Sequence, residues 1–349
     1  MPLGINMAAG GISMEQETIK MDHGSGGKLS QELMEQVILP AYGNPVLNEM
    51  HDGASVTTAG NRVAFTTDSY VVKPLFFAGG NIGKLAVCGT VNDLAMTGSI
   101  PRYLSVGMIL EEGFPIADLR LIVETMCKTA KEAGVMIVTG DTKVVNKGAG
   151  DGIYINTSGI GDIIEGTHIS PKRVQPGQDV ILSGYIGDHA TAIMAGRHEL
   201  VLPTSIQSDC APLNGLVKEM LTAVPQIAVL RDPTRGGVAA TLNEIAAQSG
   251  TGILLEEGTI PVRPEVEAVC EILGFDPLYL ANEGKMLVFV DQQYTKELLA
   301  IMHKHPYGQD ARVIGKVTAD APGQVGMRTS IGGIRIVDMP IGGQIPRIC

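Results

Sequence analysis

Several aspartates carry the clearest chemistry in this sequence, because they sit among glycines or hydroxyl residues where a carboxylate can face a ligand. Four have such surroundings, Asp52, Asp68, Asp93 and Asp232, and Asp141 joins them as a candidate. Mg²⁺ favours carboxylate oxygens, keeps several waters, and is usually completed by the phosphates of a nucleotide. Taken singly, each aspartate is more often a helix cap or a turn residue. As a set they predict a site for a hard cation.

Three other side chains add possible acid–base and phosphate chemistry. Lys143 and Lys28 could each neutralise a phosphate, although exposed lysines commonly do nothing specific. Glu283 stands between Asn and Gly just before an apolar run, where it is either a buried base or a charge at a strand edge. His23 is either a proton shuttle or a hydrogen-bonded structural histidine. These residues indicate a magnesium–nucleotide enzyme without defining its substrate.

The chain ends in a single thiol, Cys349, at the tip of a segment that cannot form a long helix. Two Gly-Gly pairs and two prolines interrupt the last 20 residues. Fully extended, such a segment reaches about 60 Å. A prenylation signal needs three residues beyond the cysteine, which excludes that kind of lipid anchor. Two interpretations stay open: a frayed terminus, or a mobile arm that carries a covalently loaded sulfur.

Composition excludes several classes of protein. The 349 residues are 44% hydrophobic and 18% charged, as expected of about two globular domains. The net charge of −11 argues against a partner held through nucleic-acid phosphates. No apolar run approaches the ~20 residues of a membrane helix, and residues 1–20 read as a flexible leader without a secretory signal. Five scattered cysteines without a Cys-x-x-Cys pair favour a reducing, cytoplasmic location.

The candidate residues must be positioned by strands and helices that alternate irregularly. A glycine loop, with Gly24, Ser25, Gly26 and Gly27, leads into an amphipathic helix and suits an anion, although glycine clusters alone are weak evidence. Further helices are expected near 83–97, 116–133, 190–195, 213–223, 238–247 and 295–303, and strands near 54–58, 63–67, 103–110, 135–138, 154–160, 179–183, 252–256, 286–290 and 312–317. This order predicts an α+β fold rather than a doubly wound sheet.

Pro171 and Pro176 mark an expected joint between two domains. The predicted organisation is a leader over 1–20, an N-terminal domain over 21–165, a C-terminal α/β domain over 170–322, and a mobile tail over 323–349.

Taken together, seven motifs closely resemble the HypE family of hydrogenase-maturation proteins. They are His23-Gly-Ser-Gly-Gly-Lys28, Thr66-Thr-Asp-Ser-Tyr-Val-Val72, Gly89-Thr-Val-Asn-Asp-Leu-Ala-Met96, Thr139-Gly-Asp-Thr-Lys-Val-Val145, Arg231-Asp-Pro-Thr-Arg-Gly-Gly-Val238, Ala281-Asn-Glu-Gly-Lys285 and Pro346-Arg-Ile-Cys349. The terminal motif is specific to that family. The glycine and aspartate pattern is shared with AIR synthetase, selenophosphate synthetase and thiamine-monophosphate kinase, the PurM-like superfamily.

The resemblance implies a fold and a set of ligands. The fold is a PurM-like pair of domains, with N-terminal strands that pair across a homodimer into a shared β-barrel. ATP would bind under the glycine loop of Gly24, Ser25, Gly26 and Gly27, with Asn92, Asp141 and Lys143 also addressing the nucleotide. Asp68, Asp93 and Asp232 would hold Mg²⁺, with Asp52 the least secure member of the set.

The resemblance also implies a reaction. A HypF-like carbamoyltransferase would load a carbamoyl group onto Cys349, and ATP-dependent dehydration would convert it to a thiocyanate. Cys349, Glu283 as the base and Lys143 as the phosphate-stabilising group would be catalytic. A HypC–HypD-like complex would accept the cyanide for the iron of [NiFe] hydrogenase.

Two alternatives come from other classes. One is a different PurM-like synthetase or small-molecule kinase, which needs its own substrate pocket and no terminal cysteine. The other is a non-catalytic scaffold that a nucleotide merely stabilises. The acidic set argues against the scaffold, because several carboxylates brought together without a cation repel one another.

Overall fold

The protein is represented by a computed structural model, which describes residues 27–39, 44–58, 61–197, 205–342, 345 and 347–349. The expected leader, His23 and three residues of the glycine loop lie outside this part of the chain. The elements of the first half are α1 (Lys28–Leu33), a π-helical turn (Met34–Ile38), a 3-10 turn (Leu47–Glu49), β1 (Ala54–Thr58), β2 (Asn61–Tyr70), β3 (Phe76–Phe77), β4 (Gly80–Asn81), α3 (Ile82–Met96), β5 (Ser99–Glu111), α4 (Ile116–Ala133), β6 (Met136–Val145) and β7 (Ile153–Ile163).

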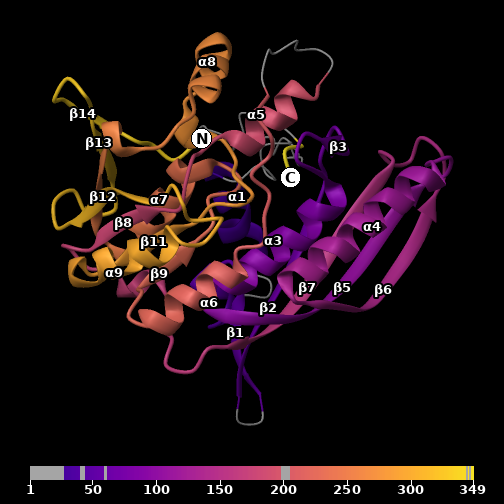
Figure 1. Ribbon diagram of the computed structural model, residues 1–349, viewed down its shortest axis with the longest axis horizontal. Helices are drawn as coiled ribbons and strands as arrows, with labels where there is room; N and C mark the ends of the chain where they lie inside the picture. The colour runs from indigo at the N-terminus through magenta and orange to yellow at the C-terminus, as the bar shows by residue number, and fades with distance from the viewer. Residues whose placement is uncertain (1–26, 40–43, 59–60, 198–204, 343–344, 346) are drawn as a thin grey trace, which may run out of the picture.

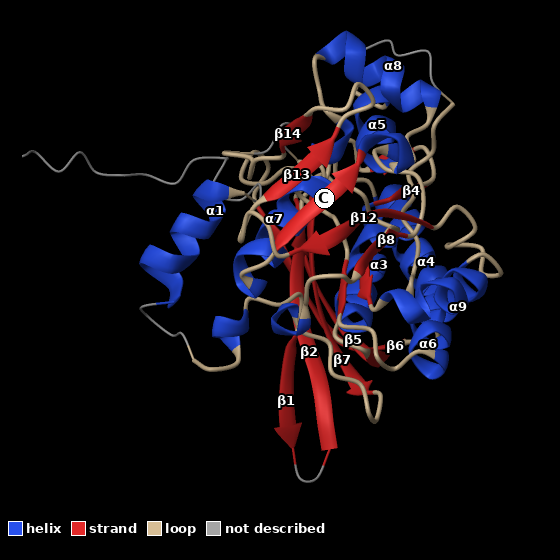
Figure 2. Ribbon diagram, turned by 90° about the vertical axis from the view of Figure 1, so that its left-hand side faces the viewer, coloured by secondary structure: helices blue, strands red, loops and turns tan. Residues whose placement is uncertain are grey.

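The first half of the described chain is built on a five-stranded sheet with the strand order β1-β2-β7-β5-β6 (Figure 1). Strand β7 runs antiparallel to both β2 and β5, whereas β5 and β6 are parallel because α4 connects them. The β1–β2 hairpin extends beyond the rest of the molecule (Figure 2). Helices α3 and α4 pack against each other, and α3 also contacts β2, β5 and β7.

Helix α3 lies at the centre of the molecule. Its N-cap is Asn81, whose side chain accepts hydrogen bonds from the amides of Gly83 and Lys84 at 2.9 and 3.2 Å. Almost every residue of the helix is buried, so it has no polar face. This explains the small residues around Asn92 and Asp93, since the sheet packs on one side of the helix and the second half of the chain on the other.

The second half contains β8 (Asp179–Leu182), α5 (Asp188–Ala195), α6 (Asn214–Ala223), β9 (Val229–Arg231), α7 (Gly237–Ser249), β10 (Gly252–Glu256), α8 (Pro264–Leu273), β11 (Leu287–Val290), α9 (Gln292–Met302), β12 (Arg312–Thr318), β13 (Val325–Arg328) and β14 (Ile334–Ile336), with 3-10 turns at Pro171–Arg173, Glu257–Thr259 and Pro277–Tyr279. Its described strands form a seven-stranded sheet in the order β14-β13-β10-β12-β8-β11-β9.

Alternation along the central strands places helices on both faces of this second sheet. Val180, Val229 and Phe289 pack with α7, whereas their neighbours Ile181 and Leu230 pack with α6 and α9. The two apolar layers give the runs of four buried residues in β8 and β11, which is the pattern expected of strands covered on both faces. The α+β prediction is therefore confirmed by the architecture.

The sequence interpretation missed helix α8 and the strands β3, β4, β9, β13 and β14. Helix α8 has the usual boundaries, with Pro264 at its first position and Gly274 in the left-handed conformation after its end. Strands β13 and β14 lie in the segment expected to be tail, yet β13 pairs with β10 and β14 pairs with β13. The segment without sheet pairing therefore begins after Ile336, because an edge of the sheet was available to the residues before it.

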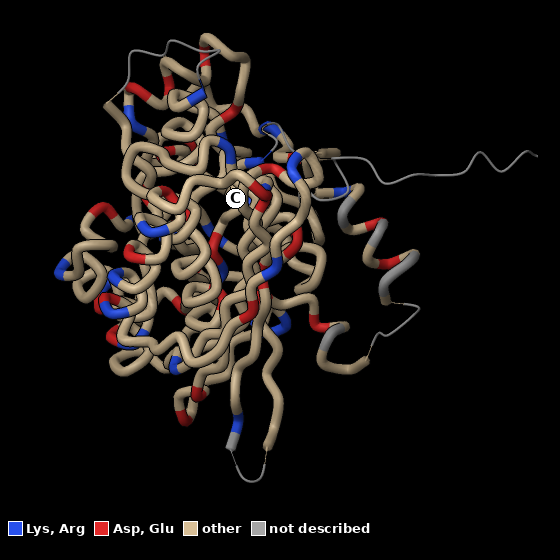
Figure 3. The backbone as a smooth tube through the Cα atoms, turned by 90° about the vertical axis from the view of Figure 1, so that its right-hand side faces the viewer, with Lys and Arg blue, Asp and Glu red and all other residues tan. Residues whose placement is uncertain are grey.

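Lys and Arg residues are interspersed with Asp and Glu residues along the drawn chain (Figure 3). Within the described residues, no helix has the length and apolar character needed to cross a bilayer.

Candidate active site

The last residues of the chain are docked between its two halves. The carbonyl oxygens of Cys349 and Arg347 accept hydrogen bonds from the amides of Val71 and Lys73, at 3.3 and 3.2 Å. Ile348 is only 6% exposed and belongs to the same apolar cluster as α3. Figure 1 places the C-terminus beside β3, between the indigo N-terminal and orange C-terminal parts of the chain. The terminal residue is therefore docked against the molecule, with Cys349 partly buried.

Cys349 lies among charged groups that come from three different segments. Burial raises the pKa of its thiol, as do the nearby carboxyl groups of Glu283 and Asp68 and a hydrogen bond with Glu283. The guanidinium group of Arg235 acts in the opposite direction on that pKa. The docked sulfur is therefore a neutral thiol, with an acidic side chain and a cation next to it.

Glu283 is 3% exposed and sits in the loop between α8 and β11. Its pKa is raised well above the ordinary value, first by burial and then by the neighbouring Cys210 and Asp232. Its Oε1 has no hydrogen-bond partner among the described residues. A buried carboxyl group with an unpartnered oxygen and a raised pKa, beside a thiol, has the features required of a general base or acid.

Three of the four predicted metal-binding aspartates raise the pKa of the fourth, Asp93. The pKa of Asp93 is raised well above its usual value by burial, and then by Asp232, Asp68 and Asp52. Burial and the charge of Asp52 raise the pKa of Asp232 to about 8, and burial raises the pKa of Asp52 to about 6. The four carboxyl groups, predicted from separate parts of the sequence, thus share one electrostatic environment.

The donor set fits a hard cation, although the ligands are not preassembled. Within the described residues, no three His, Cys, Asp or Glu side chains are placed to hold a metal together. Mg²⁺ commonly uses one or two carboxylates plus waters and phosphates, so a closed protein cage is not required. Ionising these buried groups together is unfavourable without a cation, and Oδ2 of Asp52 has no partner in the described chain. A magnesium ion would offset the cost of ionising these carboxyl groups together and would give Oδ2 of Asp52 a partner.

Asp52 has a second role that the sequence did not predict. Its Oδ1 lies 2.7 Å from Nε of Arg231, and Arg231 also pairs with Glu244 at 2.7 Å. Both Asp52 and Arg231 side chains are about one-tenth exposed. Asp52 is thus the counter-ion of a buried arginine, which makes it the least available of the four aspartates as a metal ligand.

Asp141 and Lys143 stand apart from the buried carboxyl groups, on the exposed strand β6. Lys143 Nζ lies 2.9 Å from Oδ2 of Asp141, and both side chains are about 70% exposed. Both residues line a cavity of about 310 Å³ that also includes Val71, the residue that binds the Cys349 carbonyl. Val71 therefore borders the cavity that Lys143 lines and also binds the terminal residue.

The nucleotide-binding role of Asn92 stays a prediction. Its side chain is 1% exposed, Nδ2 donates to the carbonyl of Ala211 at 3.1 Å and Oδ1 accepts from the amide of Leu213 at 2.8 Å. In the described structure Asn92 holds the segment that leads into α6. An amide on a buried helix found backbone partners, which its position in the motif could not reveal.

Of the glycine loop, Gly24, Ser25 and Gly26 lie outside the described residues. Gly27 has φ of 98°, and a Cβ at this position would meet the carbonyl oxygen of Pro340 at 2.3 Å. The amide of Lys28 donates to the same oxygen at 2.8 Å. The start of the N-terminal domain is thus in contact with the tail.

Four functional residues were not singled out from the sequence: Arg235, His189, Asp209 and Arg231. The two arginines stand in the quoted Arg-Asp-Pro-Thr-Arg-Gly-Gly motif, which was a usable signal. His189 and Asp209 lie in no motif, and only their burial between the two halves distinguishes them.

Comparison with known families matches both halves of the chain. The model of the AIR synthase related protein, N-terminal domain, covers residues 50–163. The model of the AIR synthase related protein, C-terminal domain, covers residues 175–328. A thiamine monophosphate kinase from Aquifex aeolicus shares the fold, with a TM-score of 0.61 and 17% identity over 87% of this chain and 98% of its own.

Full-length relatives are much more similar. The carbamoyl dehydratase HypE of Cupriavidus necator is 50% identical over 339 residues, 97% of each chain. That of Escherichia coli is 46% identical over 95% of this chain and 99% of its own. A solved HypE–HypF complex gives a TM-score of 0.84 at 52% identity, covering 88% of this chain and 99% of the solved one. HypE in complex with ATP gives 0.80 at 46% identity, covering 95% and 100%. With this identity along its whole length and both family models matched, the chain belongs to the carbamoyl dehydratase HypE family of AIR-synthase-related proteins.

Proposed function

We propose that this chain dehydrates an S-carbamoyl group on Cys349 to a thiocyanate, consumes ATP and releases ADP and phosphate. The cyanide would become a ligand of the iron in [NiFe] hydrogenase. The observation that carries this proposal is the thiol of Cys349 docked against Glu283 in a pocket of buried carboxyl groups. The names of the relatives and the HypE–ATP complex support the same reaction.

The chemistry requires the carbamoyl oxygen to become a leaving group. That oxygen attacks the γ-phosphorus of ATP, ADP departs, and the oxygen is now part of a phosphate ester. Loss of the two nitrogen protons then expels phosphate and leaves the sulfur bonded to C≡N. Glu283, once ionised, is the proposed acceptor for one of these protons, because its buried carboxyl group lies beside the sulfur that carries the group, and the departing phosphate takes the other proton.

Charge on the transferring phosphoryl group must be balanced by cations. Magnesium, when bound, would neutralise part of this charge. Asp68, Asp93 and Asp232 are the residues we propose to hold it, with Asp52 as a more distant carboxylate because of its pairing with Arg231. Lys143 would contribute a fixed positive charge at the cavity it lines.

Arg235 is an additional candidate in this site. The sulfur of Cys349, when ionised, raises the pKa of Arg235 most, burial lowers it, and Asp68 and Glu283 raise it further. A guanidinium group beside the sulfur is suited to bind a phosphate ester formed there, because its planar fork matches phosphate oxygens.

Loading and delivery require the tail to leave its docked position. We propose that a HypF-like carbamoyltransferase loads Cys349 and that a HypC–HypD-like complex receives the cyanide; the HypE–HypF complex among the relatives supports the first partner. Gly342 lies in the segment between β14 and the docked end. This position would let the tail swing without disturbing the sheet.

A homodimer through the N-terminal sheet is also part of the proposal. Apolar side chains are exposed on several of its strands, among them Phe65, Tyr103, Met136, Val138, Val144 and Ile160. Such a continuous apolar face is unusual on a monomer and suits a second copy of the same sheet, which would close a shared barrel. The domain division at residues 165–170 remains a proposal of the same kind.

The decisive experiment measures the mass of the C-terminal peptide. The chain is incubated with a carbamoyl donor, the carbamoyltransferase and ATP, and then cleaved before Asp338 to release a peptide that contains only Cys349 as cysteine. We expect the mass of a carbamoyl group first and that of a thiocyanate after ATP is added. The Cys349→Ala variant should show neither product while it still binds ATP. Cyanide release from that variant would refute the proposal.

Two controls separate the alternatives. Full activity of Cys349→Ala on a free substrate would favour a different PurM-like synthetase or kinase. For the scaffold, Asp93→Asn should abolish ATP turnover and leave binding of the carbamoyltransferase intact. Unchanged turnover in that variant would contradict the assignment of the aspartates.

A further inference from the structure

His189 is a buried histidine of α5 whose two ring nitrogens are both engaged. Nε2 lies 2.8 Å from the carbonyl oxygen of Ile348, and Nδ1 lies 2.8 Å from Oγ of Ser208. The side chain is 0% exposed, and burial lowers its pKa, so the ring is neutral. A carbonyl oxygen can only accept, which assigns the proton to Nε2 and makes Nδ1 the acceptor of the Ser208 hydroxyl.

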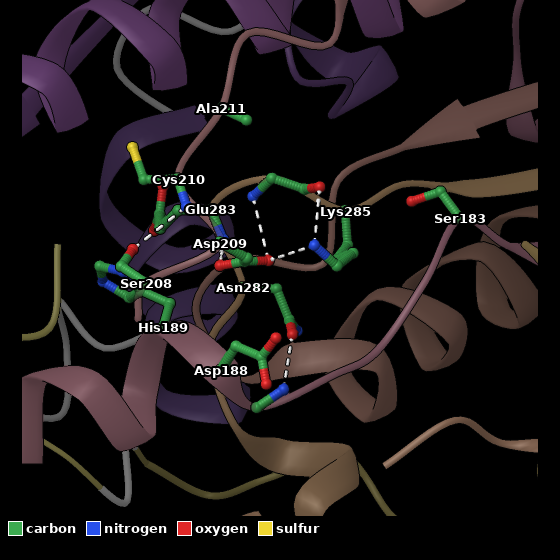
Figure 4. A network of polar contacts seen from close by, with 12 residues as sticks. Ser183, Asp188, His189, Ser208, Asp209, Cys210, Ala211, Asn282, Glu283 and Lys285 are labelled. Atoms are coloured by element: carbon green, nitrogen blue, oxygen red, sulfur yellow. Dashed lines mark hydrogen bonds and ion pairs between the residues drawn. The ribbon is translucent and has the colours of Figure 1, made fainter. Parts of the chain in front are cut away.

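Asp209, the residue after Ser208, fixes the backbone of the proposed base Glu283. Oδ1 and Oδ2 of Asp209 accept hydrogen bonds from the backbone amides of Glu283 and Gly284, at 3.0 and 3.3 Å. The same carboxylate lies 3.2 Å from Nζ of Lys285, and its side chain is only 2% exposed. Figure 4 shows Ser208 beside His189 and Asp209 beside the Glu283 loop.

The segment that carries Ser208 and Asp209 is itself fixed by its surroundings. The amide of Ser208 donates to the carbonyl of Ala78 at 2.8 Å. A Cβ on Gly284 would meet the carbonyl oxygen of Asp209 at 1.9 Å, so the two backbones approach as closely as glycine allows. The ring of His189 also packs edge-on against Phe77, with centroids 5.6 Å apart. Movement of this segment would therefore displace the His189 ring and the backbone of Glu283 together.

We infer that Ser208 and Asp209 set the position of the terminal sulfur relative to its base, with His189 as the positioning residue that holds the peptide next to Cys349. Ser208 orients the His189 ring, which fixes the Ile348 carbonyl one residue from the thiol. Asp209 fixes the backbone of Glu283. The sulfur of Cys349 and the base Glu283 come from distant parts of the sequence, and both are therefore positioned by two adjacent residues. This inference rests on the proposed function of the same site.

The test compares variants that keep or remove the Nε2 donor. His189→Asn cannot reach the Ile348 carbonyl, whereas His189→Gln places an amide nitrogen near the former Nε2. Ser208→Ala leaves the His189 ring in place but removes the hydroxyl group that fixes its orientation. Thr191→Val is the matched control, a buried α5 residue whose hydroxyl has no partner in the described chain.

Three rates are measured on the full chain through the peptide that begins at Asp338: carbamoyl loading by the carbamoyltransferase, ATP-dependent dehydration, and alkylation of the unloaded thiol by iodoacetamide. In His189→Asn and Ser208→Ala we expect dehydration to slow and alkylation to accelerate, each roughly tenfold, as loss of a buried hydrogen bond predicts. The rate of carbamoyl loading should not fall, because the tail must leave its docked position to be loaded. His189→Gln should recover most of the dehydration rate.

Wild-type alkylation and dehydration rates in His189→Asn and Ser208→Ala would overturn the inference. So would faster alkylation together with loss of both loading and dehydration, since general unfolding exposes the thiol and stops both enzymatic steps. The alkylation comparison needs no ATP and no carbamoyl donor. A wild-type chain that never forms thiocyanate therefore refutes the proposed function, while the change in alkylation still decides the role of His189.

Discussion

The carboxyl group of Glu283 lies against the thiol of Cys349, although one belongs to a loop of the second domain and the other is the last residue of the chain. Burial and the negative charge of neighbouring carboxyl groups raise the pKa of both side chains. A neutral acid beside a neutral thiol is stable at rest. Ionisation of Glu283 becomes favourable only when a cation or a hydrogen-bond donor enters the site.

Replacement of Glu283 by glutamine should separate loading from dehydration. The amide keeps the shape of the side chain but cannot accept a nitrogen proton, so the dehydration rate should fall by roughly 10²–10⁴-fold, the range for loss of general-base catalysis. Mass spectrometry of the terminal peptide should show the carbamoyl adduct accumulating. Glu256→Gln, at an exposed residue paired with Arg328, is the control. Normal thiocyanate formation in Glu283→Gln would remove this residue from the mechanism.

The buried aspartates predict how the stability of the metal-free protein depends on pH. Asp232 has a pKa of about 8 in the folded chain, against an ordinary value of 3.8. Between these values the folded state binds the extra proton, so the free energy of unfolding falls as pH rises from about 4 to about 8, by up to about 1.4 kcal/mol per pH unit for one such group.

Urea unfolding in a chelator, at about pH 5.5 and about pH 7.5, measures this slope. Asp232→Asn should flatten it, because the amide cannot ionise. Asp162→Asn, at an exposed residue of β7 paired with Arg102, should leave it unchanged. Added magnesium and ATP should stabilise the protein more at the higher pH, since only ionised carboxylates bind the metal. Equal slopes for the wild type and Asp232→Asn would contradict the assignment.

Lys143→Ala should damage catalysis without damaging the fold. The Lys143–Asp141 pair is exposed, so its loss should change the free energy of unfolding by less than about 1 kcal/mol. Loss of a positive charge at the transferring phosphoryl group should lower the rate of ATP turnover by roughly 10²–10³-fold. Lys147→Ala, at an exposed lysine in the loop after β6, is the matched control. Equal turnover in the two variants would show that Lys143 does not reach the nucleotide.

Gly284→Ala tests the close approach between the base loop and Asp209. The added methyl group would lie 1.9 Å from a backbone oxygen that cannot move alone. We expect a loss of about 1–3 kcal/mol in the free energy of unfolding, together with slower dehydration from displacement of Glu283. Gly258→Ala provides the comparison, because a Cβ there meets nothing within 4 Å. Thermal and urea unfolding of the two variants give the difference directly, and equal stabilities would exclude the contact.

The exposed strand β6 predicts a self-association surface. Val138→Lys places a charge on a side chain that is 57% exposed in the single chain. If the N-terminal sheets pair, this variant should shift the molar mass in light scattering from that of two chains to that of one. Ile272→Lys on α8 is the control, at an apolar side chain that is 69% exposed. A wild-type protein with the mass of one chain would exclude the barrel dimer under those conditions.

The sequence by itself determined most helices and strands of the two domains and the identity of the reactive groups. Helix α4 and strand β10 have the predicted bounds, since periodic apolar residues and flanking glycines act locally. Aspartates in four separate parts of the sequence, Glu283 and Cys349 were also readable, because their residue types alone restrict the chemistry.

Only the tertiary structure decided what these groups contact. It placed Asn92 against the backbone of Ala211 and Leu213, paired Asp52 with Arg231, and drew residues 325–336 into the second sheet. It also brought His189 and Asp209 to the two sides of the reacting pair. These contacts join segments far apart in the chain. They depend on which buried polar groups remain to be satisfied after the two halves pack, and that is settled by packing rather than by any local pattern.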